Sequence, residues 1–446
     1  AEKNERARAS RRARFCGFAA EYPREKPAEN AGAAIVSFSV CQTLDFCARG
    51  TYNINVNDDV RIIILRTDRG ADKPDADSDL LGRTLAEWVK GAMRGMETEL
   101  TEYRDGDDIL PAVRPLLSEV KPITAVLYSD TPLLTYPAVN ECLARFRAEC
   151  RRALKLARGW VLSTEYAASC GKIEADKVIS LGDEDFLTVF NCNQLAYASD
   201  IMRSRINYYH MNAGVTIVDP AATLIDANAV IEPGAKIGPY TVLKGRTVVR
   251  SGAEIGSHCE ISSSVIESGA VVRASTAEGA LIGRGATVGP YAHLRTGARI
   301  GARAKIGDYV EIKNSRIGAG SKVCHLAYVG DADVGEDCNI GAGVVFANYD
   351  GSVKRRTIVG KKAFVGSNAT LVAPLRIGDG AFVAAGSVVT ADVPDRALVI
   401  GRAPTAVREN WQNNAYTRSA EDNTTAPDSD ANKSRIVAMS FCEPRS

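Results

Sequence analysis

An aliphatic residue recurs at every sixth position through most of the C-terminal half of this chain, and no other feature constrains the fold as strongly. The series runs from Ile225 to Val389, with one-residue phase slips and one intervening loop. Neither the 3.6-residue period of a helix nor the two-residue alternation of an ordinary strand fits it. Glycine often follows the aliphatic residue, as at Gly238 and Gly301, which suits tight corners. Such repeats are the signature of a parallel β-helix, so we predict one over residues 214–404.

The region before the repeats, residues 31–192, predicts an alternating α/β domain. Helices are expected over Leu81–Leu100, where apolar residues follow helical spacing, and over Pro137–Leu156. A linker helix is expected over residues 193–213. Short apolar runs have the length of buried parallel strands: Ala34–Val40, Val60–Leu65 and Pro122–Tyr128.

Composition narrows the classes of partner. The formal net charge of +1 gives no global field that would favour nucleic acid or a membrane surface. No apolar stretch approaches the roughly 18 to 20 residues of a membrane span. Eleven cysteines lie scattered without Cys-x-x-Cys pairs, which favours reduced thiols in a cytoplasm. Residues 1–30, which are basic, and 405–446, which are polar, predict disordered tails. We therefore expect no nucleic-acid partner and no membrane span.

Blocks of non-repeating polar residues within the repeats are more specific than the repeats themselves. On these blocks, the chain from about Leu127 to Trp411 resembles the bacterial bifunctional N-acetylglucosamine-1-phosphate uridyltransferase/glucosamine-1-phosphate acetyltransferase family. The resemblance implies a left-handed β-helix that assembles as a homotrimer. It also implies acetyl transfer from acetyl-CoA to glucosamine-1-phosphate, on the route to UDP-N-acetylglucosamine and peptidoglycan precursors. The blocks are Gly289–Arg295, Tyr309–Lys313, His325–Asp331, Asn339–Gly343, Asn348–Gly351, Phe364–Ser367 and Arg402–Pro404.

The resemblance assigns roles to individual residues of the β-helix. His325, one of only four histidines, is implied as the general base that deprotonates the attacking amine. Without the resemblance, the residues assigned below have an ordinary explanation. Charged residues that face outward are usually solvated, and small residues are common at the corners of hexapeptide repeats. The implied sugar-phosphate contacts are Arg295, Lys313, Tyr328, Asn339 and Lys354. The implied acetyl-CoA contacts are Ala342, Asn348, Tyr349, Ser367, Ala385 and Arg402.

The N-terminal half departs from the family pattern. The glycine-rich loop whose amides would hold nucleotide phosphates is missing before residue 120. Asp130 survives at the end of a predicted strand and resembles the family's Mg²⁺ ligand. Alignment on the Gln194-Leu-Ala segment places Phe190 where the family's second ligand is implied, with Asn191 beside it. We expect a nucleotidyltransferase-like fold that has lost uridylyl transfer and has a structural role or another ligand.

Three functions remain open at this point. The leading hypothesis is glucosamine-1-phosphate N-acetyltransferase. The second is a sugar-1-phosphate nucleotidyltransferase, or uridyltransferase, whose β-helix serves mainly for trimerisation. The third is a non-catalytic scaffold trimer.

Overall fold

The computed structural model describes residues 58–70, 73–93, 95–180, 184–407 and 409. The predicted basic tail, nearly all of the predicted polar tail and the predicted strand Ala34–Val40 lie outside the described residues. The chain divides into two compact units, Ala1–Gly285 and Ala286–Ser446. This boundary lies within the repeats, and each unit is described by itself.

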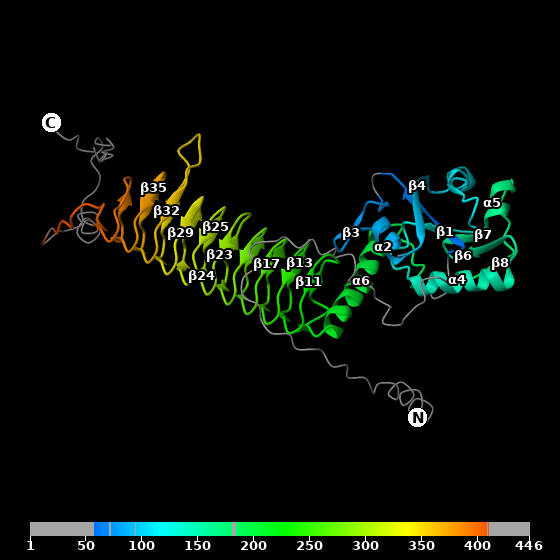
Figure 1. The fold of residues 1–446 in the computed structure, drawn as a ribbon, viewed down its shortest axis with the longest axis horizontal. Coiled ribbons are helices and arrows are strands. Elements are labelled where there is room, and N and C mark those ends of the chain that lie inside the picture. Colours follow the sequence, from blue (N-terminus) through cyan, green and yellow to red (C-terminus); the bar gives the residue numbers. More distant parts are fainter. Residues whose placement is uncertain (1–57, 71–72, 94, 181–183, 408, 410–446) are drawn as a thin grey trace, which may run out of the picture. The chain divides into compact units, whose positions relative to one another are not determined.

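The described part of the first unit contains a six-stranded sheet in the order β4-β1-β5-β7-β6-β8 (Figure 1). Strands β4, β1 and β5 are parallel, so their carboxyl ends share one edge of the sheet. Strand β7 runs antiparallel to β5 and β6, so the parallel pattern expected from the sequence holds for only part of the sheet. The strands are β1 (Val60–Asp68), β4 (Glu97–Arg104), β5 (Ile123–Tyr128), β6 (Ala153–Leu156), β7 (Gly159–Ser163) and β8 (Lys177–Val178).

Both faces of this sheet are covered, which makes a three-layer α/β/α arrangement. Ile62 and Ile64 of β1 pack with α2 and α4, whereas the alternating Ile63 and Leu65 pack with α3 and α5. Alternation along the strand sends successive side chains to opposite faces, so a continuous apolar run fits a strand buried on both. The helices are α2 (Leu85–Ala92), α3 (Leu110–Val113), η3 (Arg114–Leu116), α4 (Tyr136–Glu149), α5 (Thr164–Ser169) and α6 (Cys192–Asn212).

Two of the predicted helices are shorter than expected. The helix predicted over Leu81–Leu100 is confirmed only as α2, because Thr84 forms a capping box with Glu87 that starts it there. Gly95 then has a positive φ of 79°, and the chain continues as β4. The helix predicted over Pro137–Leu156 ends at Glu149, and its last residues instead form β6. A short hairpin, β2 (Asp79–Leu80) and β3 (Arg83–Thr84), precedes α2.

After α6, the first unit continues as stacked coils whose three short strands fall in three parallel sheets. Ile225 pairs with Leu243, and Ile237 pairs with Ile255, so aliphatic residues of the repeat lie directly above one another. The sheets comprise β9 (Thr216–Ile217), β12 (Lys236–Ile237), β15 (Glu254–Ile255) and β18 (Val271–Val272); β10 (Leu224–Ile225), β13 (Val242–Lys244), β16 (Glu260–Ser262) and β19 (Thr276–Glu278); and β11 (Val230–Ile231), β14 (Val248–Val249), β17 (Val265–Ile266) and β20 (Leu281–Ile282).

The second unit consists of the same kind of coil, also with one strand per coil in each of three sheets (Figure 1). The first sheet contains β21 (Thr287–Val288), β24 (Lys305–Asp308), β27 (Lys322–His325), β30 (Asn339–Ile340), β33 (Phe364–Val365), β36 (Phe382–Val383) and β38 (Leu398–Val399). The second contains β22 (His293–Leu294), β25 (Glu311–Lys313), β28 (Tyr328–Gly330), β31 (Val345–Ala347), β34 (Thr370–Val372) and β37 (Val388–Val389). The third contains β23 (Arg299–Ile300), β26 (Arg316–Ile317), β29 (Ala332–Val334), β32 (Thr357–Val359) and β35 (Leu375–Ile377).

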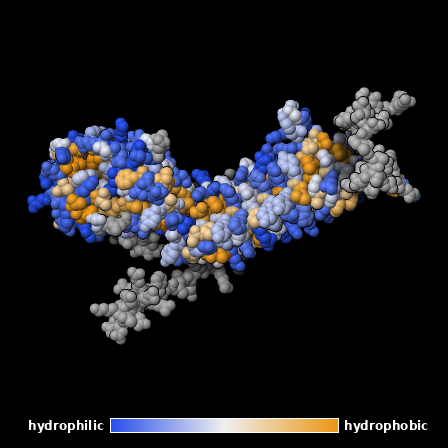
Figure 2. Space-filling model, turned by 180° about the vertical axis from the view of Figure 1, so that it is seen from behind, coloured by the Kyte–Doolittle hydropathy of each residue, from blue (hydrophilic) through white to orange (hydrophobic). Residues whose placement is uncertain are grey.

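The predicted left-handed parallel β-helix is therefore confirmed. The repeating aliphatic residues from Ile225 to Val389 are buried inside the coils. The face seen in Figure 2 is mostly hydrophilic, with smaller hydrophobic areas between. Among the described helices, none combines the length and the apolar character that a bilayer crossing requires. The seven cysteines within the described residues are all free thiols.

Candidate active site

One corner of the β-helix in the second unit stacks several of the sequence-predicted residues in a column. At each step the next coil donates a backbone N–H to the column residue's carbonyl oxygen, for example Gly343 to His325 at 3.1 Å and Gly386 to Ser367 at 2.8 Å. Each column residue precedes a residue with positive φ, which turns the corner. We call this set the corner column; from the N-terminal coil upward it contains Asp308, His325, Ala342, Ser367 and Ala385.

His325 is fixed by the residue one coil below it. Its Nδ1 lies 2.5 Å from Oδ1 of Asp308, and the two residues are Cα partners in adjacent strands. The backbone N–H of Asp308 itself and the His325 imidazole hold the pKa of the Asp308 carboxyl below its usual value. An ionised carboxylate can only accept, so in the neutral imidazole Nδ1 carries the proton and Nε2 keeps its lone pair. The His325 side chain is 58% exposed, so an incoming substrate can reach it.

Three cations gather on the second sheet and on the loop after β31; we call Arg295, Lys313 and Lys354 the cation group. Arg295 donates to Glu311 at 2.8 Å. The side chain of Lys354, followed by its positive charge and that of Arg295, lowers the pKa of Lys313. Among the described residues, neither lysine makes an ion pair with a carboxylate. Two lysines held close together without an ion-paired carboxylate suit a bound phosphate, which would relieve their repulsion.

Gly330 makes room for two further predicted residues. A Cβ at this position would clash with the Tyr328 hydroxyl and with the Asn348 amide nitrogen. Asp331 fixes the Asn348 amide, accepting from its Nδ2 at 2.5 Å, and also accepts from Asn314 at 2.6 Å. In the adjacent strand, Lys313 is the Cα partner of Gly330. Asn348, predicted to contact acetyl-CoA, therefore lies beside Tyr328, which is predicted to contact the sugar phosphate.

The remaining predicted residues lie around these two groups. Asn339 is half-buried on β30, on the same sheet as the strand that carries His325. Tyr349 is 59% exposed, and its hydroxyl donates to the carbonyl of Gly351 at 2.6 Å. Arg402 lies at the top of the corner column, since a Cβ at Gly386 would sit 3.8 Å from its Cδ.

Asp130, the predicted metal ligand of the first unit, is closed off by arginines. Its fully buried carboxylate accepts from Arg69 and from Arg158 Nη2, the latter at 2.7 Å. Both arginines also donate to Asp105, each at 2.8 Å. Burial raises the pKa of Asp105, but the hydrogen bonds of Arg158 and Arg69 outweigh it, and the pKa is lowered. These four residues, which we call the arginine cluster, carry no formal net charge.

The residues around Asp130 do not fit a divalent metal. The Phe190 ring centroid lies 4.5 Å from Cζ of Arg69, so the aromatic ring supports a guanidinium and offers no ligand atom. Asn191 caps α6, and its side chain accepts from Gln194 at 3.0 Å. Mg²⁺ requires oxygen ligands, but guanidinium donors already occupy the carboxylate here. Within the described ranges, no group of three or more His, Cys, Asp or Glu could hold a metal ion. The residues around Asp130 therefore do not support the Mg²⁺ site that the sequence predicted there, and that site stays a prediction.

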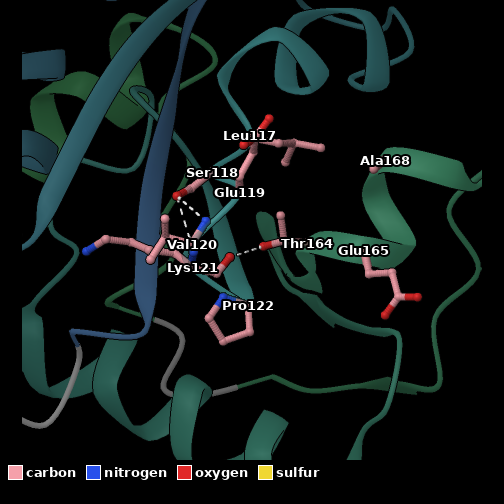
Figure 3. Close-up of a pocket in the computed structure, with 9 residues that line it drawn as sticks. All are labelled: Leu117, Ser118, Glu119, Val120, Lys121, Pro122, Thr164, Glu165 and Ala168. Carbon is pink, nitrogen blue, oxygen red and sulfur yellow. Dashed lines mark hydrogen bonds between the residues drawn. The ribbon is translucent and has the colours of Figure 1, made fainter.

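A hollow of about 350 Å³ lies at the opposite edge of the sheet, where β5 begins (Figure 3). Ser118 Oγ accepts from the backbone N–H groups of Val120 at 3.3 Å and Lys121 at 3.2 Å. Thr164 donates to the Lys121 carbonyl at 2.7 Å. None of the sequence-predicted site residues lines this hollow.

Sequence reasoning missed two residues that position others. Asp308 fixes His325, and its separation of 17 residues from it, one coil of the β-helix, was the available signal. Asp331 fixes Asn348 and is likewise 17 residues before it. In a β-helix, polar residues one coil apart are lateral neighbours, just as residues four apart are on an α-helix.

Comparison with known families supports the repeats. The family described as "Bacterial transferase hexapeptide (six repeats)" matches residues 279–314, and "Hexapeptide repeat of succinyl-transferase" matches residues 356–391. A structure of UDP-N-acetylglucosamine acyltransferase from Francisella novicida covers 42% of this chain and 67% of its own, at 18% identity and a TM-score of 0.31.

Sequence identity to curated proteins is much higher than the 18% identity to that structure. "Bifunctional protein GlmU" of Desulfitobacterium hafniense is 48% identical over 221 residues, which are 50% of this chain and 49% of that protein. The protein of the same name from Geobacillus thermodenitrificans is 49% identical over 217 residues, 49% of this chain and 47% of its own. The chain spans about half the length of the curated relatives it matches. The resemblance predicted from the sequence blocks is confirmed over that half.

Proposed function

We propose that this chain transfers the acetyl group of acetyl-CoA to the amine of glucosamine-1-phosphate, and that residues 214–404 carry the reaction. The observation that carries the proposal is the corner column, in which the His325–Asp308 pair lies below a row of small side chains. The 48% identity to a bifunctional protein GlmU over half of this chain supports the same reaction.

His325 acts as the base of the reaction. Because Asp308 holds the proton on Nδ1, Nε2 is available to take a proton from the sugar ammonium. The amine nitrogen then attacks the thioester carbonyl; the new C–N bond forms, the C–S bond breaks, and CoA leaves as its thiol. Because a hexosamine amine is largely protonated at neutral pH, a positioned base raises the fraction of nucleophile in the site.

The acetyl-CoA arm runs along the corner column above His325. From His325 to Ala385 the column rises by three coils, or about 14 Å at the usual spacing of neighbouring strands. Ala342, Ser367 and Ala385 have side chains small enough for an extended thioester arm to approach the backbone. Arg402, at the top of the column, is placed to meet a nucleotide phosphate.

The cation group binds the sugar phosphate. Its two lysines lie close enough to lower the pKa of Lys313, and a phosphate dianion would stabilise both charged forms. Tyr328, Asn339 and the Asp331-held Asn348 supply hydrogen bonds for the sugar hydroxyls. We assign Asn348 to this group because of its place beside Tyr328.

Three further features belong to the same proposal. We propose that the protein is a homotrimer, in which Tyr349 reaches acetyl-CoA held beside a neighbouring chain. The reaction would take place in the cytoplasm, the compartment that the unpaired cysteines favour. No metal ion takes part, because deprotonation and phosphate binding are both supplied by side chains.

Release of free CoA tests this function. The full chain is mixed with acetyl-CoA and glucosamine-1-phosphate, and the new thiol is followed with a thiol reagent after protein thiols have been counted separately. The matched control acceptor is N-acetylglucosamine-1-phosphate, whose nitrogen can no longer attack. We expect catalytic CoA release with the amine only; equal release with both acceptors, or release with neither, would refute the proposal.

A further inference from the structure

The first unit contains a second concentration of cations, at the edge of its sheet where three parallel strands end. Asp68 and Arg69 follow or end β1, Arg104 ends β4, and Asp130 follows β5. A cleft of about 480 Å³ opens there, lined mainly by Asp68, Arg69, Lys73, Arg104, Asp105 and Phe190. In open α/β sheets, ligands bind outside the carboxyl ends of the strands.

Arg69 and Asp105 of the arginine cluster line this cleft; we call them its floor, and Asp130 and Arg158 are hydrogen-bonded to them. Arg69 uses three donor groups, to Asp105, to Asp130 and to the carbonyl of Val189 at 2.8 Å, and its side chain is only 5% exposed. Arg158 stacks on Tyr128, with Cζ 4.0 Å from the ring centroid. Two guanidinium groups therefore supply, next to two carboxylates, the positive charge that a divalent cation would supply.

The neutralised floor changes what can approach it. Two bare carboxylates would repel a phosphate unless a metal ion lay between them. Here the floor is neutral, and the wall adds Lys73 and Arg104 against the single carboxylate of Asp68, which accepts from the backbone of Gly70 at 2.9 Å. Among the described residues, neither Lys73 nor Arg104 makes a side-chain ion pair.

We propose that this cleft binds the phosphate groups of a phosphorylated small molecule without a divalent metal, using Lys73 and Arg104, with Arg69 and Arg158 in place of the cation. Arg104 supplies a planar fork for two phosphate oxygens, and Lys73 supplies a point charge. This binding is separate from acetyl transfer, because the cleft belongs to the first unit and shares no residue with the corner column or the cation group.

Calorimetric titration of the full chain with inorganic pyrophosphate, in EDTA, tests the proposal. The cation group could bind the same probe, so the titration uses the Lys313→Met/Lys354→Met variant. In this double variant we expect pyrophosphate to bind saturably in EDTA. Replacing EDTA with Mg²⁺ should not strengthen the binding, once the Mg²⁺ that pyrophosphate itself binds in solution has been taken into account. Adding Arg104→Gln should weaken binding at least about tenfold, whereas Lys172→Gln, an exposed lysine outside the cleft, should leave it unchanged. Absence of binding in EDTA, binding that requires Mg²⁺, or equal binding by the Arg104 and Lys172 variants would each overturn the proposal.

A thermal-shift experiment tests the substitution of arginine for metal separately. The unsubstituted chain should have the same unfolding midpoint in EDTA and in Mn²⁺, because its carboxylates are already paired. The Arg158→Ala variant leaves Asp105 and Asp130 with the single guanidinium of Arg69, so Mn²⁺ should raise its midpoint by a few degrees. The same Mn²⁺-induced rise in both proteins would contradict the proposal. If the variant does not fold, the titration in EDTA remains decisive.

Discussion

Two groups of basic residues in this protein have opposite electrostatic arrangements. In the arginine cluster, Arg69 and Arg158 are paired with Asp105 and Asp130, and Asp130 is fully buried. In the cation group, Lys313 and Lys354 lie beside each other without an ion-paired carboxylate among the described residues. The first arrangement uses its charges to hold the fold together. The second keeps them available for a ligand.

This difference predicts which measurement each group should affect. A cation whose partners are protein carboxylates contributes to folding stability, and its removal leaves a buried charge uncompensated. A cation held near like charges costs some stability and gains it back only when an anion binds. Stability and substrate affinity should therefore separate between variants of the two groups.

The largest effect is expected from the base itself. His325→Ala should lower kcat by roughly 10² to 10⁴-fold, the range for a positioned general base, with little change in the KM for acetyl-CoA. Cys324→Ala is the matched control, because it changes the adjacent residue of the same strand. Steady-state rates at saturating substrates make the comparison. A folded His325 variant within about threefold of the unsubstituted chain would show that another group is the base.

Arg158→Met should cost stability and spare catalysis. It leaves the carboxylates of Asp105 and Asp130 with a single guanidinium, so the free energy of unfolding should fall by about 3 kcal/mol. Chemical unfolding followed by tryptophan fluorescence measures this, since Trp88 and Trp160 both lie in the first unit. The rate of CoA release should not change at temperatures where the variant is folded. An unchanged unfolding midpoint would mean that the cluster is not a stabilising one.

Asp308→Asn tests whether the His325 tautomer matters. An amide can donate to Nδ1 as well as accept from it, so the imidazole loses its fixed orientation of donor and acceptor. We expect kcat to fall by about tenfold or more, or about 1.4 kcal/mol in the barrier. The pH profile of kcat should also move, which a purely structural role of Asp308 would not cause. An unchanged profile and rate would remove Asp308 from the mechanism.

Lys313→Met should weaken substrate binding and spare folding stability, whereas Arg158→Met should cost stability and spare catalysis. Loss of one charge-assisted hydrogen bond to phosphate should raise the KM for glucosamine-1-phosphate by about tenfold, and the KM for acetyl-CoA should stay the same. Folding stability should be unchanged or slightly higher, because the repulsion from Lys354 disappears. Lys305→Met, an exposed lysine on the first sheet, is the control. A loss of stability without a change in KM would place Lys313 in the same class as the paired arginines.

The smallest expected effect is an acid dependence of the first unit. The pKa of Asp105 is lowered in the folded chain by Arg158 and Arg69, despite the opposing effect of burial. Its contribution to stability is therefore complete above the unfolded value of about 3.9 and is lost as pH falls through the folded value. Asp105→Asn should flatten this part of the curve of unfolding midpoint against pH. If the unfolding midpoint of the variant fell at low pH in the same way as that of the unsubstituted chain, the pairing of Asp105 with Arg69 and Arg158 would be contradicted.

The sequence predicted the β-helix well because one buried aliphatic side chain per hexapeptide leaves a period that no other fold shares. It predicted the α/β unit less well. The apolar spacing of Leu81 to Leu100 concealed a capping box at Thr84 and a strand after Gly95, which are local signals stronger than the periodicity. Gln194, used to align the family's second ligand, turned out to pair with the Asn191 cap.

The charge partners could not be predicted from the sequence at all. Arg69 and Arg158 are 61 and 28 residues from Asp130, and nothing in the spacing indicates that they meet. The partners of Asp308 and Asp331, by contrast, lie one coil away and could be found once the period is known. Repeats convert distant contacts into a fixed sequence separation, whereas an α/β fold does not.

Mass spectrometry of the products of a single reaction tests the central claim most directly. The full chain is incubated with glucosamine-1-phosphate, acetyl-CoA, UTP and Mg²⁺, and the sugar products are identified. An open cation group and a closed arginine cluster predict that N-acetylglucosamine-1-phosphate accumulates with an equal amount of CoA and that no UDP-sugar forms. Appearance of UDP-N-acetylglucosamine would show that the arginine cluster does not exclude metal-dependent chemistry, and absence of the acetylated sugar would contradict the assignment of the corner column.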